Sequence, residues 1–130
     1  MLTIDLKKNR LRIYKQTLHM LDDPEYIQFL VSPEKRVLAV RRTADDERSA
    51  IKIYWTTLKD RNQCCEFYSK PFVSRLGRLL NREDDDFCTH RMYGRVDQRR
   101  KRVFFDLGSS EIISEEAEAE GMGDVPDAEI

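Results

Sequence analysis

The side chains most able to do chemistry in this chain are basic, and they are densest between His90 and Arg102. This segment contains six Lys or Arg residues and one acid, Asp97. Cationic side chains bind phosphate mainly through charge, with an affinity that depends strongly on salt and little on base sequence. The sequence therefore predicts a nucleic-acid-binding surface formed by Arg91, Arg95, Arg99, Arg100, Lys101 and Arg102.

The predicted geometry of this segment is a β-hairpin with its turn near Asp97–Arg100. Side chains two residues apart in a strand point to the same face, so Arg91, Tyr93 and Arg95 are expected to lie together. The basic residues near the turn have long side chains that can reach a partner. An alternative stays open, because Lys and Arg also keep an exposed sheet edge from pairing with other chains.

A second basic group lies near the N-terminus and consists of Lys7, Lys8, Arg10 and Arg12. Leu11 and Ile13 alternate with the two arginines, as in a half-buried strand. An arginine fork can hold a phosphate or a guanine edge in bidentate fashion, which would make this group part of a DNA contact. The alternative is that Arg10 and Arg12 only form the solvent-facing side of the strand, and the sequence leaves both interpretations open.

Catalytic and metal-binding arrangements are not predicted. The chain has two histidines, His19 and His90, and no nucleophile, base and orienting group in a recognisable pattern, so we expect a non-enzymatic protein without a cofactor. Cys64, Cys65 and Cys88 are expected to be reduced, buried thiols. A metal site using these cysteines and His90 is the alternative, but their spacing is not one that zinc sites commonly use.

Charge divides the chain into two parts. Residues 1–110 contain all 23 Lys and Arg residues and 16 acids, a formal charge of +7, whereas residues 111–130 contain eight acids and no Lys or Arg. We predict one basic domain over 1–110 and a disordered acidic tail over 111–130, because a segment of low hydrophobicity and one charge sign cannot offset its ordering entropy. No apolar run is long enough for a membrane span, and a cytoplasmic location is expected.

The domain is predicted to be α+β and to contain two strand–short helix–β-hairpin units, at about 4–42 and 64–108, in one pseudo-symmetric body. In the first unit, a strand from about Asn9 precedes a helix that Thr17 opens, and a hairpin follows over Tyr26–Val31 and Val37–Val40. A further strand is expected over Ala50–Trp55, between the units.

In the second unit, Phe67 and Tyr68 are extended. Ser69 caps a helix that has Pro71 in its first turn. Two strands follow over Phe87–Val96 and Arg102–Leu107. Phe87, Phe104 and Phe105 are interpreted as core residues rather than as a stacking platform for bases.

The first unit resembles the swapped-hairpin transcription factors of the AbrB type. The resemblance covers about residues 4–40 and includes the segment Ile4–Ile13, the apolar pair Leu18 and Leu21 of the short helix, and the hairpin that follows. MraZ-type proteins are similar and carry two such units in one chain. The sequence departs from the pattern at Asn9, where the family has glycine, and at Tyr14, where proline is common. Asn tolerates a left-handed backbone well, so the turn at Asn9 is compatible with the family.

The resemblance implies that paired units present basic side chains to duplex DNA from a β-rich platform, with Arg10 and Arg12 at the basic positions and Lys7 and Lys8 beside them. The leading hypothesis is therefore a DNA-binding transcriptional regulator. A homodimer is plausible, although a monomer suffices if the two halves pair within one chain. The alternative hypothesis is a small protein that binds and inhibits a nucleic-acid enzyme, such as an anti-CRISPR-like factor of a phage or mobile element.

Overall fold

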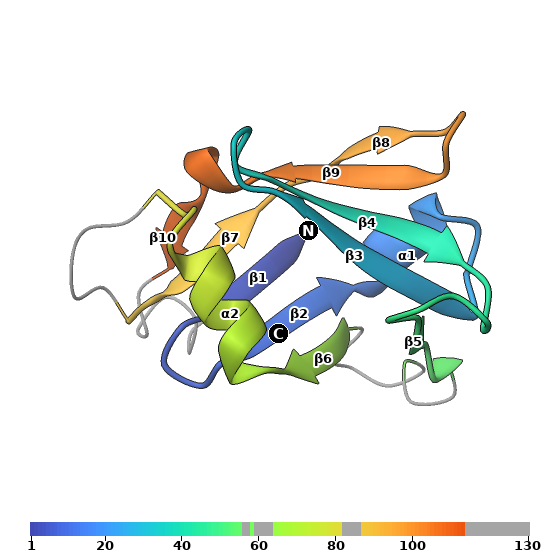
Figure 1. Cartoon of the computed structure of the whole chain (residues 1–130), viewed down its shortest axis with the longest axis horizontal. Helices are drawn as coiled ribbons and strands as arrows, with labels where there is room; N and C mark the ends of the chain where they lie inside the picture. The colour runs from blue at the N-terminus through green and yellow to red at the C-terminus, as the bar shows by residue number, and fades with distance from the viewer. Residues whose placement is uncertain (56–57, 59–63, 82–86, 114–130) are drawn as a thin grey trace, which may run out of the picture.

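The computed structural model describes residues 1–55, 58, 64–81 and 87–113. They form two five-stranded antiparallel sheets and two short helices (Figure 1), which agrees with the predicted mixture of strands and helices. In spatial order, sheet A contains β10 (Glu111–Ile113), β7 (Thr89–Met92), β1 (Leu2–Asp5), β2 (Arg10–Tyr14) and β6 (Cys64–Tyr68). Sheet B contains β5 (Ile51–Lys52), β3 (Tyr26–Ser32), β4 (Val37–Thr43), β9 (Arg102–Asp106) and β8 (Arg95–Asp97).

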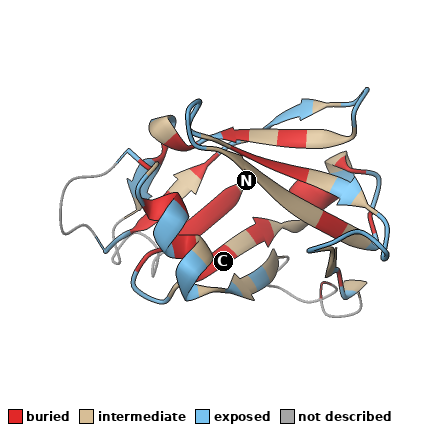
Figure 2. Ribbon diagram, viewed as in Figure 1, coloured by how far each residue is buried: buried red, intermediate tan, exposed pale blue. Residues whose placement is uncertain are grey.

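The hydrophobic core lies between the two sheets, and Figure 2 shows the buried strand segments that enclose it. Alternate residues of each strand point inward, as the two-residue period of a strand requires. Sheet A contributes Leu2, Ile4, Leu11 and Ile13, and sheet B contributes Leu38, Val40, Val103 and Phe105, all of which are buried. The residues between them on each strand consequently face outward, and these outer faces hold the polar side chains discussed below.

In the chain, α1 connects β2 of sheet A to β3 of sheet B, and α2 connects β6 to β7, both of sheet A. α2 (Lys70–Gly77) begins as predicted: the Ser69 hydroxyl accepts a hydrogen bond from the Phe72 amide at 3.3 Å, and Pro71 occupies the first turn. α1 (Lys15–Met20) begins two residues earlier than predicted, after Tyr14. Thr17 is therefore not its cap; it is buried, and its hydroxyl bonds the amino group and the carbonyl of Met1.

The predicted hairpin of the first half is confirmed, since β3 and β4 pair over seven residues each. Asn9 has a φ of 53°, the left-handed conformation expected at this turn. The predicted strand Phe87–Val96 is wrong, because this stretch contains two strands in different sheets. β7 pairs with β1 in sheet A, and β8 pairs with β9 in sheet B, so the chain crosses between sheets at Tyr93–Gly94.

Two further boundaries differ from the predictions. Glu111–Ile113 form β10 against β7, so the first three residues of the predicted disordered tail belong to the folded body. Residues 114–130 lie outside the described part of the chain. The strand predicted over Ala50–Trp55 is limited to β5, and β1 was not predicted. Within the described residues, neither helix is long and apolar enough to cross a membrane.

Candidate nucleic-acid interface

The N-terminal arginines lie on the outer face of sheet A, where carboxylates neutralise them. Arg10 is 8% exposed and donates to Asp5 at 3.0 Å and to Glu66 at 3.3 Å. Arg12 donates to the same Glu66 oxygen at 2.8 Å. Arg12 and Glu66 are directly opposite each other on β2 and β6. The expectation that Arg10 faces an open surface is wrong, because its guanidinium is buried in an ion-pair network within the chain.

Lys7 and Lys8 are exposed in the turn between β1 and β2. Their backbone amides donate to the Asp5 carboxylate at 3.0 and 3.1 Å. Asp5 therefore holds the turn in place and also pairs with Arg10. The turn is at the opposite end of the molecule from the β8–β9 hairpin tip (Figure 1). Lys7 and Lys8 are therefore separated from the main basic segment of the sequence.

The basic segment is itself divided between the two sheets. Arg91 lies on β7, donates to Glu111 of β10 at 2.9 Å, and has its guanidinium 5.7 Å from the centre of the Tyr93 ring. Arg95 lies on β8 in the other sheet. The prediction that Arg91, Tyr93 and Arg95 share one face is wrong for Arg95, because the two-residue period does not continue through the crossing at Gly94; Arg91 and Tyr93 do lie together. An added Cβ at Gly94 would lie 2.4 Å from Val103, so only glycine fits this crossing without a shift.

The remaining basic residues gather on the outer face of sheet B. Strand register places Leu30, Ala39, Phe104 and Arg95 in one row across β3, β4, β9 and β8. The neighbouring row contains Gln28, Arg41, Arg102 and Asp97. We call this surface and the adjoining hairpin tip the basic face; its cations are Lys35, Arg41, Arg95, Arg99, Arg100 and Arg102.

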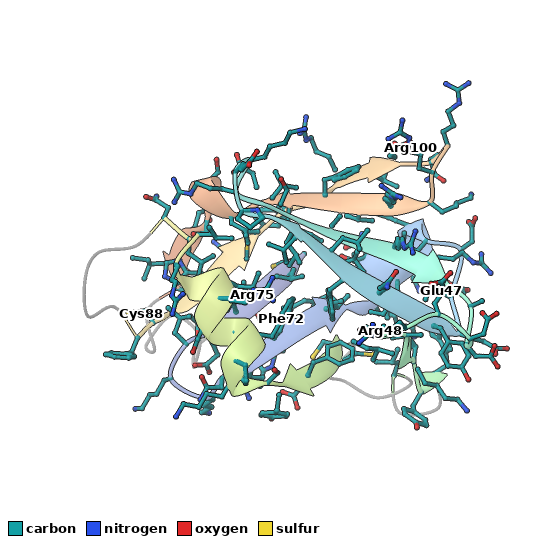
Figure 3. The ribbon with its side chains drawn as sticks, viewed as in Figure 1. Glu47, Arg48, Phe72, Arg75, Cys88 and Arg100 are labelled. Atoms are coloured by element: carbon teal, nitrogen blue, oxygen red, sulfur yellow. The ribbon has the colours of Figure 1, made fainter. Side chains whose placement is uncertain are left out.

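The tip of the hairpin is held by Asp97, whose carboxylate accepts hydrogen bonds from the amides of Arg99 and Arg100 at 3.2 and 3.3 Å. Arg99 and Arg100 are exposed, and Arg100 lies at the end of the molecule that the hairpin forms (Figure 3). Lys101 turns away from them, with a φ of 53°, and bonds Asp22 at 2.5 Å. This contact holds the pKa of Asp22 below its usual range, first through the hydrogen bond and then through the charge of Lys101.

Charge on the basic face is largely uncompensated. Within the described residues, the side chains of Lys35, Arg95, Arg99 and Arg102 form no ion pair, and Arg100 is 4.0 Å from Asp97. The other carboxylate on these strands, Asp106, accepts from the Gly108 amide and the Ser109 hydroxyl. In this respect these four cations differ from the arginines of sheet A, which are paired with carboxylates of the described residues.

The basic face also contains a hollow of about 410 Å³, lined by Lys35, Arg95, Arg102 and Asp106 and by apolar residues that include Leu30, Val37, Ala39 and Phe104. The interpretation of the phenylalanines as core residues is correct for Phe105, which is fully buried. It is wrong for Phe104, which is half-buried on the opposite face, and for Phe87, which is 63% exposed.

Sequence reasoning missed Lys35, Arg41 and Phe104 as residues of this face. The available signal was alternation: Phe104 and Phe105 must point to opposite sides of one strand, and Arg41 is two residues from Ala39. The pairing of β4 with β9, which joins the two halves of the chain, carries no comparable local signal.

The cysteines and His90 do not converge. Cys64 and Cys65 lie on β6, whereas Cys88 and His90 lie at β7, with β1 and β2 between them. Three strand spacings correspond to about 14 Å, too far for one metal ion.

Cys88 is exposed rather than buried as predicted, and burial raises the pKa of the Cys65 thiol to about 11. His90 is buried in the core with Nδ1 at 3.0 Å from the Ser110 hydroxyl. Within the described residues, no group of three His, Cys, Asp or Glu could hold a metal.

Comparison with known proteins gives no relative: no family model, no curated protein and no solved structure matches the chain.

Proposed function

We propose that this protein binds nucleic acid without catalysing a reaction, through the basic face of sheet B, and that duplex DNA is a target. The observation that carries the proposal is the group of cations on this face that have no partner in the described part of the chain: Lys35, Arg95, Arg99 and Arg102. Regulation of transcription is the role that such binding would serve.

Charge contrast between the two sheets supports this choice of surface. The arginines of sheet A are 2.8 to 3.3 Å from carboxylates of the same chain, so a phosphate would have to displace Asp5, Glu66 or Glu111. Among the described residues, no carboxylate forms an ion pair with Arg95 or Arg102, so no such displacement is required there. Each phosphate that is neutralised releases condensed counterions, and the logarithm of the affinity falls with the logarithm of the salt concentration by about 0.9 per phosphate on B-DNA.

Salt titration of duplex binding tests the proposal. Fluorescence anisotropy with a labelled random duplex gives the affinity at several salt concentrations for the wild type and for Arg95→Gln/Arg102→Gln. The double variant should bind more weakly, and its salt slope should be reduced by about 1.8, or two phosphate contacts. Arg75→Gln/Arg78→Gln is the matched control, because it removes the same charge from exposed positions on and beside α2, away from the hairpin (Figure 3).

Equal losses in the two double variants would show that net charge, and not this face, determines binding. Absence of duplex binding by the wild type at low salt would overturn the proposal of duplex binding. If the wild type bound neither duplex nor single-stranded nucleic acid, the alternative of a protein-binding inhibitor would remain. The apolar floor of the hollow would then supply a contact surface for the protein partner.

The acidic tail is proposed to compete with nucleic acid for the basic face, because residues 114–130 carry seven acids and no Lys or Arg. A chain that ends at Ile113 should bind duplex DNA more tightly than the full chain. Truncation at Ser110 would be a poor test, since it would also remove β10 from sheet A. Unchanged or weaker binding after truncation at Ile113 would refute the competition without affecting the basic face.

The two halves are proposed to be related by duplication, as two pseudo-symmetric units. The order strand, helix, hairpin recurs as β2, α1, β3–β4 and as β6, α2, β8–β9, with β7 inserted between α2 and β8 in the second half. The units pair through equivalent strands, β2 with β6 and β4 with β9. Tyr14 and Tyr68 end the corresponding strands. Arg12 and Glu66, which each lie two positions before the tyrosine of their own strand, are directly opposite each other. Since this pairing is made within one chain, a monomer suffices for binding, and light scattering would test whether a homodimer forms.

A further inference from the structure

The hollow on the basic face has an apolar floor and a cationic rim. Ala39 lies between Leu30 on β3 and Phe104 on β9, so the smallest side chain of the row is flanked by two large ones. Arg95 continues this row on β8, Arg102 begins the next row, and Lys35 approaches from the β3–β4 turn. The volume of about 410 Å³ is within the range of about 300–1,000 Å³ typical of small-molecule sites.

Phe104 does not belong to the core. It is half-buried and points outward, whereas its neighbours Val103 and Phe105 are fully buried between the sheets. An aromatic ring at the wall of a hollow, beside arginines, combines a surface on which a base can stack with groups that donate hydrogen bonds to phosphate. Proteins that bind single strands use this combination, because every base has a face that can stack on an aromatic side chain while the groove follows the backbone charge.

We propose that the hollow binds one unpaired nucleobase, stacked on Phe104, of a single-stranded nucleic acid whose phosphates contact Arg95 and Arg102. This inference rests on the proposed function and extends it, since it names the form of nucleic acid that fits the face most completely. Bases in a duplex are stacked on one another and cannot enter the hollow unless they are extruded. Duplex DNA therefore uses the cations alone, whereas a single strand uses the cations and the ring.

The test compares a labelled twelve-nucleotide single strand with a duplex of the same length, by anisotropy at fixed salt. Phe104→Leu removes the ring and keeps the charge of the face, and Ala39→Leu fills the hollow. Each variant should lose roughly 5- to 150-fold in affinity for the single strand, the factor that corresponds to stacking of one base. Duplex affinity should stay within about twofold. Tyr68→Leu is the matched control, because Tyr68 is a 64% exposed aromatic residue on sheet A, and neither affinity should change.

The outcomes separate this inference from the proposed function. Single-strand binding that responds to Arg95→Gln/Arg102→Gln but not to Phe104→Leu or Ala39→Leu would overturn base stacking and leave the basic face in place. Equal losses for single strand and duplex in Phe104→Leu would also overturn it. Absence of binding to either form by the wild type would overturn both proposals, and an acidic protein segment would then be the ligand to test in the hollow. Thermal melting verifies that each variant is folded, and Ala39→Leu decides the matter if Phe104→Leu is not.

Discussion

The ion pairs of Arg10 with Asp5 and Glu66 give the most direct test of whether the arginines of sheet A stabilise the fold, in contrast to the arginines proposed to bind a partner. Arg10→Met removes the guanidinium but keeps an unbranched apolar side chain of similar length. Asp5, whose side chain is 10% exposed, then remains buried without its cation. Glu66 is less affected, because it is more exposed and keeps Arg12 at 2.8 Å. The perturbation therefore isolates one buried carboxylate.

The expected loss of stability follows from this geometry. Removing one member of a buried ion pair costs about 3–5 kcal/mol, because an uncompensated charge is left in the interior. Asp5 keeps two backbone hydrogen bonds, from Lys7 and Lys8, so the lower end of this range applies. A loss of about 3 kcal/mol is a large fraction of the roughly 5–15 kcal/mol that stabilises a typical domain.

Urea denaturation followed by Trp55 fluorescence measures this loss. With a slope of about 2 kcal/mol/M, the midpoint should fall by about 1.5 M in Arg10→Met. Arg91→Met is the control, because the Arg91–Glu111 pair is more exposed, with 37% and 60% of the side chains accessible, and exposed pairs contribute about 0–1 kcal/mol. Asp5→Asn in the Arg10→Met background should restore part of the loss, since the stranded charge is removed. Equal midpoints for Arg10→Met and Arg91→Met would refute the assignment of Arg10 to a buried structural network.

Three further predictions concern other contacts. Gly94→Ala should destabilise the fold by about 1–3 kcal/mol in thermal denaturation, because the new methyl group would overlap Val103. The double variant Gly94→Ala/Val103→Ala should lose less stability than the sum of the losses of the two single variants, because Val103→Ala removes the overlap. The pKa of the Asp22 carboxyl, measured by NMR, should lie below its usual value of about 3.9 and rise toward it in Lys101→Met. The contact between Asp22 and Lys101 should thus stabilise the wild type at a pH above the usual pKa of about 3.9, and this stabilisation should be lost as the pH falls through the lowered pKa. With a pKa of about 11, Cys65 should react with iodoacetamide about 200-fold more slowly at pH 8 than an ordinary thiol, as peptide mapping by mass spectrometry would show, and faster as the pH is raised.

Local features of the fold were predictable from the sequence because their causes are local. A serine followed two residues later by proline predicts the start of α2, and the two nearby apolar segments Tyr26–Val31 and Val37–Val40 predict the β3–β4 hairpin. Asn9 adopts the left-handed backbone for which its residue type is suited. In each of these cases, the residues that decide the structure are within a few positions of one another.

Features that depend on distant pairing were not predictable in this way. Arg10 and Glu66 are separated by 56 positions and meet only because β2 pairs with β6. The alternation around Arg10 and Arg12 correctly indicates a strand, but it does not reveal which carboxylates lie across from it. The crossing at Gly94 likewise depends on the positions of Val103 and Phe105 in the other sheet. A run of basic residues that looks continuous in the sequence is for this reason divided between two faces.

The division gives the two sets of arginines different physical roles. On sheet A, ion pairs between Arg and acid join β7 to β10 and β2 to β6, which are neighbours in space but distant in the sequence, and the cations are used within the fold. On sheet B, Arg95 and Arg102 surround an apolar hollow, and the nearby carboxylates of Asp97 and Asp106 accept hydrogen bonds from backbone amides instead. Unpaired charge raises self-repulsion in the folded state, and the anionic partner proposed above would relieve this repulsion on sheet B. The density of basic residues in the sequence therefore overstates the proposed interface, whose main cations are those without an ion-pair partner among the described residues.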